Sequence, residues 1–178
     1  MSETQKRYGL VQVYTGSGKG KTTASLGLAL RASGHGWIVK MISFMKGDPN
    51  YGEVLAAQHI PNFELIQSGL PTFVKKGQPS DEDLRLAREG LSKAKQYVRN
   101  EVIDLVILDE INVAVDYGLI PLNDLMSLID EKASSQELVL TGRYAHPDIV
   151  KRADLVSEIL EIKHPFQQGI KCREGVDY

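Results

Sequence analysis

A glycine-rich stretch near the start of the chain constrains the fold more than any other feature of the sequence. Residues 15–23 read Thr-Gly-Ser-Gly-Lys-Gly-Lys-Thr-Thr, between the apolar run at 10–14 and a helical pattern rich in Ala and Leu. A strand, a glycine-rich loop and a helix in this order are typical of a phosphate-binding loop, or P-loop. Glycines let successive backbone N–H groups point into one concavity, and the start of the helix adds positive partial charge. The stretch therefore predicts a site for a phosphate-bearing ligand.

Individual positions of the P-loop carry separate expectations. We expect the ligand to be surrounded by Thr15, Gly16, Ser17, Gly18, Lys19, Gly20, Lys21, Thr22 and Thr23. Lys21 would neutralise phosphate charge, and the Thr22 hydroxyl would bind Mg²⁺ or Mn²⁺. The common pattern has glycine at the position of Thr15, so the first residue of the loop departs from it. The alternative is a glycine-rich turn that binds no ligand.

The composition fits one domain of an ordinary globular protein. The chain has 178 residues, of which 42% are hydrophobic and 25% charged, so we expect a single P-loop domain over residues 1–178. A formal net charge of -2 gives no electrostatic footprint for nucleic acid. Residues 1–7 lack the apolar core of a signal peptide, and no apolar run is long enough to span a bilayer. We therefore expect a cytoplasmic protein with no nucleic-acid or membrane partner.

Apolar, β-branched runs alternate with helical patterns along the whole chain. Strands are expected over residues 10–14, 38–44, 63–67, 105–108, 138–141 and 155–162, the last at an edge of the sheet. Further helices are expected from 81 to about 99 with a capping box of Ser80 and Asp83, from 121 to 129, and from about 147. The alternation predicts an α/β fold, P-loop NTPase-like, with a mainly parallel central sheet and helices on both faces.

Charged residues follow two of the expected buried strands. Asp109 and Glu110 come directly after the strand at 105–108, and Arg143 comes shortly after the strand at 138–141. Because these strand ends lie at the edge where the P-loop opens, one of the acids could reach Mg²⁺ directly or through water. An arginine there could bind phosphate and stabilise a leaving group. The alternatives are a solvated strand end for the acids and a surface ion pair for Arg143.

Residues 68–77 are predicted to form a long loop that carries two apolar side chains. Leu70 and Phe73 lie there among turn residues, after the expected strand at 63–67. Such a loop could cover a flat apolar ligand at the edge of the sheet, whereas the alternative is that Phe73 packs the loop onto the core. The four histidines share no metal-ligand spacing, and no residue is marked as a general base.

Together these motifs resemble one family, the ATP:corrinoid adenosyltransferases of the P-loop type. The resemblance is carried by the P-loop and by residues 31–36, 44–47, 108–112, 141–143, 153–158, 163–166, 169–171 and 175–178, so it covers nearly the whole chain. Thr15 at the first position of the loop is the form that this family uses. Two features differ from some members: only residues 1–7 precede the first strand, so no covering N-terminal segment is expected, and the loop at 68–77 has no Trp.

The resemblance implies a specific reaction. The family transfers the 5′-deoxyadenosyl group of ATP to the Co(I) centre of a reduced corrinoid, forming adenosylcobalamin or its precursor and releasing triphosphate. The ATP lies in the P-loop with reversed polarity compared with ordinary P-loop NTPases. Lys21 and Arg143 are then the expected catalytic residues, and Leu70 and Phe73 the expected corrinoid contacts. Metal binding is expected from Thr22, Asp109 and Glu110. The family also implies a homodimer and a flavoprotein reductant.

The P-loop by itself leaves two other functions open. A hydrolysing ATPase would couple ATP turnover to a conformational change and release phosphate. A nucleotide-regulated binding protein would deliver a corrinoid to a partner enzyme without chemistry of its own. A free-phosphate assay distinguishes the first from an adenosyltransferase, and turnover beyond one equivalent excludes the second.

Overall fold

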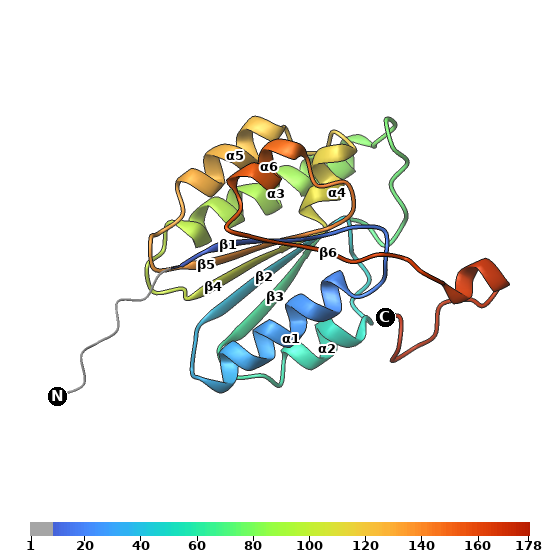
Figure 1. The fold of residues 1–178 in the computed structure, drawn as a ribbon, viewed down its shortest axis with the longest axis horizontal. Coiled ribbons are helices and arrows are strands. Elements are labelled where there is room, and N and C mark those ends of the chain that lie inside the picture. Colours follow the sequence, from blue (N-terminus) through green and yellow to red (C-terminus); the bar gives the residue numbers. More distant parts are fainter. Residues whose placement is uncertain (1–8) are drawn as a thin grey trace.

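A computed structural model describes residues 9–178 of the chain (Figure 1). The expectations about a signal peptide and a covering N-terminal segment concern residues 1–7, which lie outside the described part. Six strands form one sheet in the order β3-β2-β4-β5-β1-β6. The strands are β1 Val11–Thr15, β2 Val39–Phe44, β3 Phe63–Ser68, β4 Leu105–Asp109, β5 Glu137–Thr141 and β6 Leu155–Glu158. Every neighbouring pair is parallel, which confirms the α/β fold with a parallel sheet.

Helices cover both faces of the sheet, as the sequence predicts. They are α1 Lys21–Gly34, α2 Gly52–Ala57, α3 Asp81–Val98, α4 Ile111–Asp116, α5 Leu122–Asp130 and α6 Pro147–Arg152, with a 3₁₀ turn η1 at Pro165–Gln168. Figure 1 shows α1 and α2 on one face and α3 to α6 on the other. Among residues 9–178, no helix combines the length and apolarity needed to cross a membrane.

The core consists of two layers, one on each face of the sheet. In the central strand β4 every residue is buried, which fits a strand covered on both sides. The larger layer lies between the sheet and the helices α3 to α6, and the smaller one lies beneath α1. One face of α3 carries an apolar stripe of residues spaced three or four apart, and this face packs against the larger layer. Its buried residues there are Ala87, Leu91, Ala94 and Val98. This rigid sheet fixes the positions of the loops at its carboxyl edge.

Two expected elements differ in detail from the structure. The edge strand β6 ends at Glu158 and not at residue 162. Its partner β1 ends at Thr15, and the chain after β6 then runs along the P-loop, where the N–H of Gly18 donates to the carbonyl of Ile159 at 2.7 Å. Pro121 is the N-cap of α5 and lies just before its first turn. The capping box of α3 is present, with the N–H of Asp83 donating to Ser80 Oγ.

Candidate active site

The P-loop leads from the end of β1 directly into α1. Gly16 and Gly20 have φ values of 96° and 123°, which glycine adopts without the steric penalty of a side chain. Gly20 is the N-cap of α1 and has no side chain, so the first backbone N–H groups of the helix stay available to a ligand. A Cβ at Gly18 would come within 2.5 Å of the carbonyl of Leu160. The segment after β6 therefore packs closely against one side of the loop.

Lys21 keeps its ammonium group inside the loop. Its Nζ donates to the carbonyls of Gly16, at 2.8 Å, and Gly18, at 2.6 Å. The residue is only 7% exposed, and this burial lowers the pKa of Lys21 below its ordinary value. A cation is thus held within the backbone concavity that the sequence predicts to bind phosphate.

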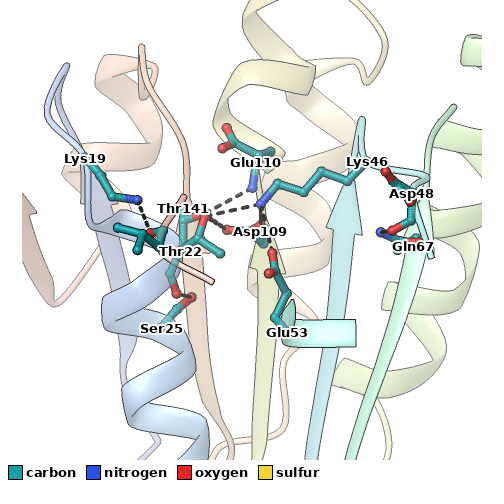
Figure 2. A network of polar contacts seen from close by, with 11 residues as sticks. Lys19, Thr22, Ser25, Lys46, Asp48, Glu53, Gln67, Asp109, Glu110 and Thr141 are labelled. Carbon is teal, nitrogen blue, oxygen red and sulfur yellow. Dashed lines mark hydrogen bonds and ion pairs between the residues drawn. The ribbon is translucent and has the colours of Figure 1, made fainter. Parts of the chain in front are cut away.

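Asp109, the last residue of β4, is the centre of a buried polar network (Figure 2). Its Oδ1 accepts hydrogen bonds from the hydroxyls of Thr22, at 2.9 Å, and Thr141, at 2.6 Å. Its Oδ2 accepts from Lys46 Nζ at 2.8 Å. The carboxylate therefore joins the first turn of α1 to the ends of β5 and β2, as expected if these strand ends meet at one edge of the sheet.

Lys46 and Glu53 belong to this network, although the sequence analysis gave neither of them a role. Lys46 follows β2, and Met45 before it has a φ of 58°, a left-handed conformation that turns the chain at the strand end. Lys46 Nζ lies 2.8 Å from Asp109 and 3.9 Å from Glu53 Oε1. Burial lowers the pKa of Lys46, but the charge of Asp109 and the hydrogen bond to it outweigh burial, so this pKa lies above its ordinary value. Lys46 is therefore a firmly protonated counter-ion for Asp109.

Glu110 differs from its neighbour in geometry and environment. It is the N-cap of α4 with a φ of 58°, and its backbone N–H donates to Thr141 Oγ1 at 3.1 Å. In Figure 2 its carboxylate points away from that of Asp109. Burial, and then the charge of Asp109, raise the pKa of Glu110. The sequence gives both acids the same expected role in metal binding, but the turn between β4 and α4 points their side chains in different directions.

Arg143 lies beside the start of the P-loop. Together with Thr15, Gly16 and Ser17 it lines a pocket of about 350 Å³, which Tyr144, Ala145 and Glu158 complete. The backbone N–H of Ala145 donates to Thr15 Oγ1 at 3.3 Å, so the segment after β5 is tied to the first residue of the loop. The structure therefore brings Arg143 to the P-loop, at the same edge of the sheet as Asp109.

The loop that carries Leu70 and Phe73 is anchored at this edge, but Phe73 does not pack onto the core. The side chain of Phe73 is 102% exposed, which excludes the core-packing alternative, and Leu70 is half-buried. Further along the loop, Lys76 forms an ion pair with Asp116 at 2.6 Å. Its ammonium also faces the rings of Tyr117, at 5.8 Å, and Tyr144, at 5.6 Å. The loop is thus held next to the residue that follows Arg143.

Lys19 points out of the P-loop toward the C-terminal residues. Its Nζ donates to the carbonyl of Val176 at 3.0 Å and pairs with Asp177 at 3.1 Å. The ring of Tyr178 lies 5.9 Å from that of Tyr51. The end of the chain therefore lies over the P-loop and the start of α2. This contact cannot be predicted from the sequence, because nothing in the spacing of residues links positions so far apart.

The residues around Asp109 fit a Mg²⁺ or Mn²⁺ ion. Within residues 9–178, no group of three or more His, Cys, Asp and Glu could hold a metal by itself. Mg²⁺ bound with a nucleotide needs less, because one or two carboxylates suffice when phosphates and water supply the other ligands. Thr22 and Asp109 offer two oxygens 2.9 Å apart, and the ammonium of Lys46 already lies beside them. The position therefore suits a cation.

Comparison with known proteins gives one consistent family. The sequence model of the family described as ATP:corrinoid adenosyltransferase BtuR/CobO/CobP matches residues 7–178. The corrinoid adenosyltransferase of Escherichia coli K12 is 37% identical over 179 residues, which cover 100% of this chain and 90% of the relative.

Two further relatives have the same coverage of this chain. Corrinoid adenosyltransferase CobA of Salmonella typhimurium LT2 is 35% identical over 100% of this chain and 90% of the relative. The corrinoid adenosyltransferase of Pseudomonas aeruginosa PAO1 is 31% identical over 100% of this chain and 88% of the relative. The chain therefore belongs to the ATP:corrinoid adenosyltransferase family, a family of transferase enzymes.

Proposed function

We propose that this protein transfers the 5′-deoxyadenosyl group of ATP to the Co(I) centre of a corrinoid. Cobalt supplies the electron pair for the new Co–C5′ bond, the bond between C5′ and the phosphate oxygen breaks, and triphosphate leaves with the electrons of that bond. Co(I) is itself a strong nucleophile, so the protein need not supply one. The observation that carries the proposal is the contact between Thr22 of the P-loop and buried Asp109, in a chain whose family performs this transfer.

The chain's own residues have two tasks in this reaction, binding the triphosphate and stabilising it as it leaves. Lys21, the backbone N–H groups of the P-loop and Arg143 place positive charge where negative charge develops on the departing oxygen. Thr22 and Asp109 would hold Mg²⁺, which supplies further charge neutralisation for the phosphates. Since its carboxylate points away from Asp109, Glu110 would act only through water or by its charge.

The loop at 69–80 is the proposed corrinoid side of the site. Phe73 is exposed and Leu70 is half-buried on a loop held at the carboxyl edge by Lys76. An exposed aromatic ring at this edge can contact a flat apolar macrocycle. The family resemblance implies that such a ring displaces the lower axial ligand of cobalt. Displacement of that ligand makes Co(II) easier to reduce to Co(I).

The proposal includes the setting in which the enzyme works. The family resemblance favours a homodimer and a flavoprotein as the reductant. The sequence favours a single P-loop domain over residues 1–178 and a cytoplasmic location. Neither the family match nor the named relatives support the hydrolysing ATPase that the P-loop alone leaves open.

A spectroscopic assay tests the proposed reaction. Protein, MgATP and chemically reduced cobalamin are mixed without oxygen, and the visible spectrum is followed over time. We expect the Co(I) spectrum to be replaced by that of an alkylated Co(III) corrinoid over many turnovers. A spectrum that stays unchanged with folded, ATP-binding protein would contradict the proposal.

A further inference from the structure

The ammonium group of Lys46 lies where the proposed metal would contact the protein. Its Nζ is 2.8 Å from Asp109 Oδ2 and 3.4 Å from Thr22 Oγ1, so it approaches both proposed metal ligands. The side chain of Asp109 is 0% exposed and that of Lys46 is 19% exposed. A carboxylate buried to this degree is stable as an anion only when a cation or several donors compensate it. Lys46 supplies that cation.

A divalent ion cannot simply join this arrangement. Oδ1 of Asp109 accepts from the hydroxyls of Thr22 and Thr141, and Oδ2 accepts from Lys46. An ionised carboxylate has about four lone-pair positions and three are used, so the one that remains is on Oδ2, next to the ammonium of Lys46. Two cations roughly 3 Å apart in a buried site also repel each other strongly. Entry of the metal therefore requires the ammonium of Lys46 to move.

Glu53 offers the moving ammonium a second partner. Its Oε1 lies 3.9 Å from Lys46 Nζ, its side chain is 14% exposed, and it belongs to the first turn of α2. Figure 2 shows the end of the Lys46 side chain beside the carboxylates of both Asp109 and Glu53. A small rotation of this long side chain toward Glu53 would free Asp109 and keep the ammonium paired.

We propose that Lys46 is a positioning residue, a built-in cation that neutralises Asp109 until the metal enters with ATP and that then passes to Glu53. This inference rests on the metal role proposed above for Thr22 and Asp109. It follows that the nucleotide-free protein binds a divalent ion weakly, because the ion must displace the ammonium. With ATP present, the phosphates add ligands to the metal and the displacement becomes favourable. Lys46 thus couples metal binding to nucleotide binding.

Binding of Mn²⁺ alone, without nucleotide, tests the inference. Electron paramagnetic resonance measures free Mn²⁺ during a titration of the wild-type protein and of Lys46→Met. We expect Lys46→Met to bind Mn²⁺ at least about tenfold more tightly than the wild type. Its unfolding midpoint, lowered by the uncompensated carboxylate, should rise when Mn²⁺ is added. Equal Mn²⁺ affinity in the two proteins would overturn the inference.

Lys40→Met is the matched control for this titration. Lys40 lies on the same strand β2 and forms an ion pair with Glu64 at 2.7 Å, away from Asp109. The control therefore also removes a paired lysine, and we expect it to bind Mn²⁺ as weakly as the wild type. Tighter Mn²⁺ binding by both variants alike would contradict a specific role of Lys46.

A double variant keeps the test decisive if Lys46→Met is unstable. Lys46→Met combined with Asp109→Asn removes both charges, so it should fold and show no gain in Mn²⁺ binding. A single variant that folds only with Mn²⁺ supports the inference, because the ion then replaces the ammonium. A single variant that stays unfolded with Mn²⁺, while the double variant folds, overturns it.

Binding of Mn·ATP to Asp109→Asn separates the proposed metal role of Asp109 from the proposed role of Lys46. Unchanged Mn·ATP binding would overturn the proposed metal role of Asp109 itself. Weakened Mn·ATP binding by Asp109→Asn, together with a Lys46→Met variant that binds Mn²⁺ like the wild type, would overturn only the role of Lys46. Weakened Mn·ATP binding together with the tenfold gain in Lys46→Met supports both.

Discussion

Two buried charged residues at the carboxyl edge of the sheet, Lys21 and Asp109, are central to the proposed reaction. Lys21 holds a cation within the P-loop, and Asp109 holds an anion at the end of β4. Each is compensated by its own neighbours, Lys21 by backbone carbonyls and Asp109 by two hydroxyls and Lys46. MgATP would therefore exchange partners with groups that are already desolvated, so little further desolvation of the protein is needed.

Replacing Lys21 tests the phosphate assignment. Lys21→Ala should remain folded, because the loop keeps its backbone hydrogen bond to the segment after β6, and it should abolish adenosyl transfer. A charge-assisted contact is worth about 1.5–3 kcal/mol, so ATP affinity should fall about tenfold or more. Isothermal titration with ATP and the spectral assay measure the two effects. Lys19→Ala, in the same loop but paired with Asp177, is the control and should lose far less activity. Unchanged ATP affinity in folded Lys21→Ala would refute the assignment.

Replacing the two acids separately tests which one serves the metal. Asp109→Asn should raise the Mg²⁺ concentration needed for half-maximal activity by about tenfold or more, since it removes the negative charge of the carboxylate ligand. Glu110→Gln should raise it much less, because its carboxylate points away from Asp109. A magnesium titration of both variants measures the difference. The reverse order, or normal titrations for both, would show that Asp109 is only a structural strand end.

At the scale of elements, the sequence predicts the six strands and the central helices but not how the loops meet. Strand β4 can be predicted from the sequence because four apolar residues precede Asp109. Helix α3 can be predicted because its apolar stripe follows a capping box. The helices α2 and α4 have six residues each, too few to show a period. Lys46 could have been suspected, since it too follows a buried strand. Its contact with Asp109 depends on β2 lying beside β4, and periodicity does not encode strand order.

Glu53 and Glu110 also have positions in the site that local sequence patterns do not predict. Glu53 reaches Lys46 only because α2 packs against β3, the strand beside β2, and no local pattern marks it. Glu110 is adjacent to Asp109 in sequence, but a left-handed backbone conformation at the start of α4 turns it away. Adjacent residues are therefore a weak guide to a shared ligand, because one backbone turn decides where each side chain points.

The exposed ring of Phe73 gives a prediction about the loop between β3 and α3. Phe73→Ala should leave stability almost unchanged, because a fully exposed side chain contributes little to the core. It should slow the reaction of Co(II) substrate with a protein reductant more than that of pre-reduced Co(I), because only the former needs the lower ligand removed. Parallel assays with the two substrates measure this ratio, and Leu55→Ala, another exposed apolar side chain, is the control. Equal losses with both substrates would exclude this role for Phe73.

At the scale of the whole molecule, the C-terminal residues connect the end of the chain to the P-loop. Asp177 accepts hydrogen bonds from Arg173 and pairs with Lys19 at 3.1 Å. These contacts, those of Arg173 first, lower the pKa of Asp177 from 3.8 to about 2. Because the folded pKa lies below the ordinary value, the contact is complete above the ordinary value and is lost as the pH falls toward about 2. At neutral pH the tail therefore stays on the P-loop.

Loss of the Asp177 charge should loosen the tail. In Asp177→Asn the guanidinium of Arg173 loses its ionic partner, so trypsin should cut after Arg173 at least about threefold faster than in the wild type. Asp148→Asn is the control. It also removes an exposed aspartate that forms an ion pair, but the partner of Asp148 is Lys151 and not Arg173 or Lys19. Timed digestion followed by mass spectrometry gives the rates. Identical cleavage in the wild type and Asp177→Asn would show that this contact does not hold the tail.

The fate of the phosphates of ATP tests the proposed reaction most directly. Attack of cobalt at C5′ leaves all three phosphates joined, whereas hydrolysis requires a positioned water. Phosphorus NMR of a reaction with MgATP and reduced corrinoid should show inorganic triphosphate in a one-to-one ratio with adenosylated corrinoid. A matched sample without corrinoid should show negligible phosphate. Steady release of orthophosphate by the pure protein in the corrinoid-free sample would contradict the proposed adenosyl transfer and favour an ordinary P-loop ATPase.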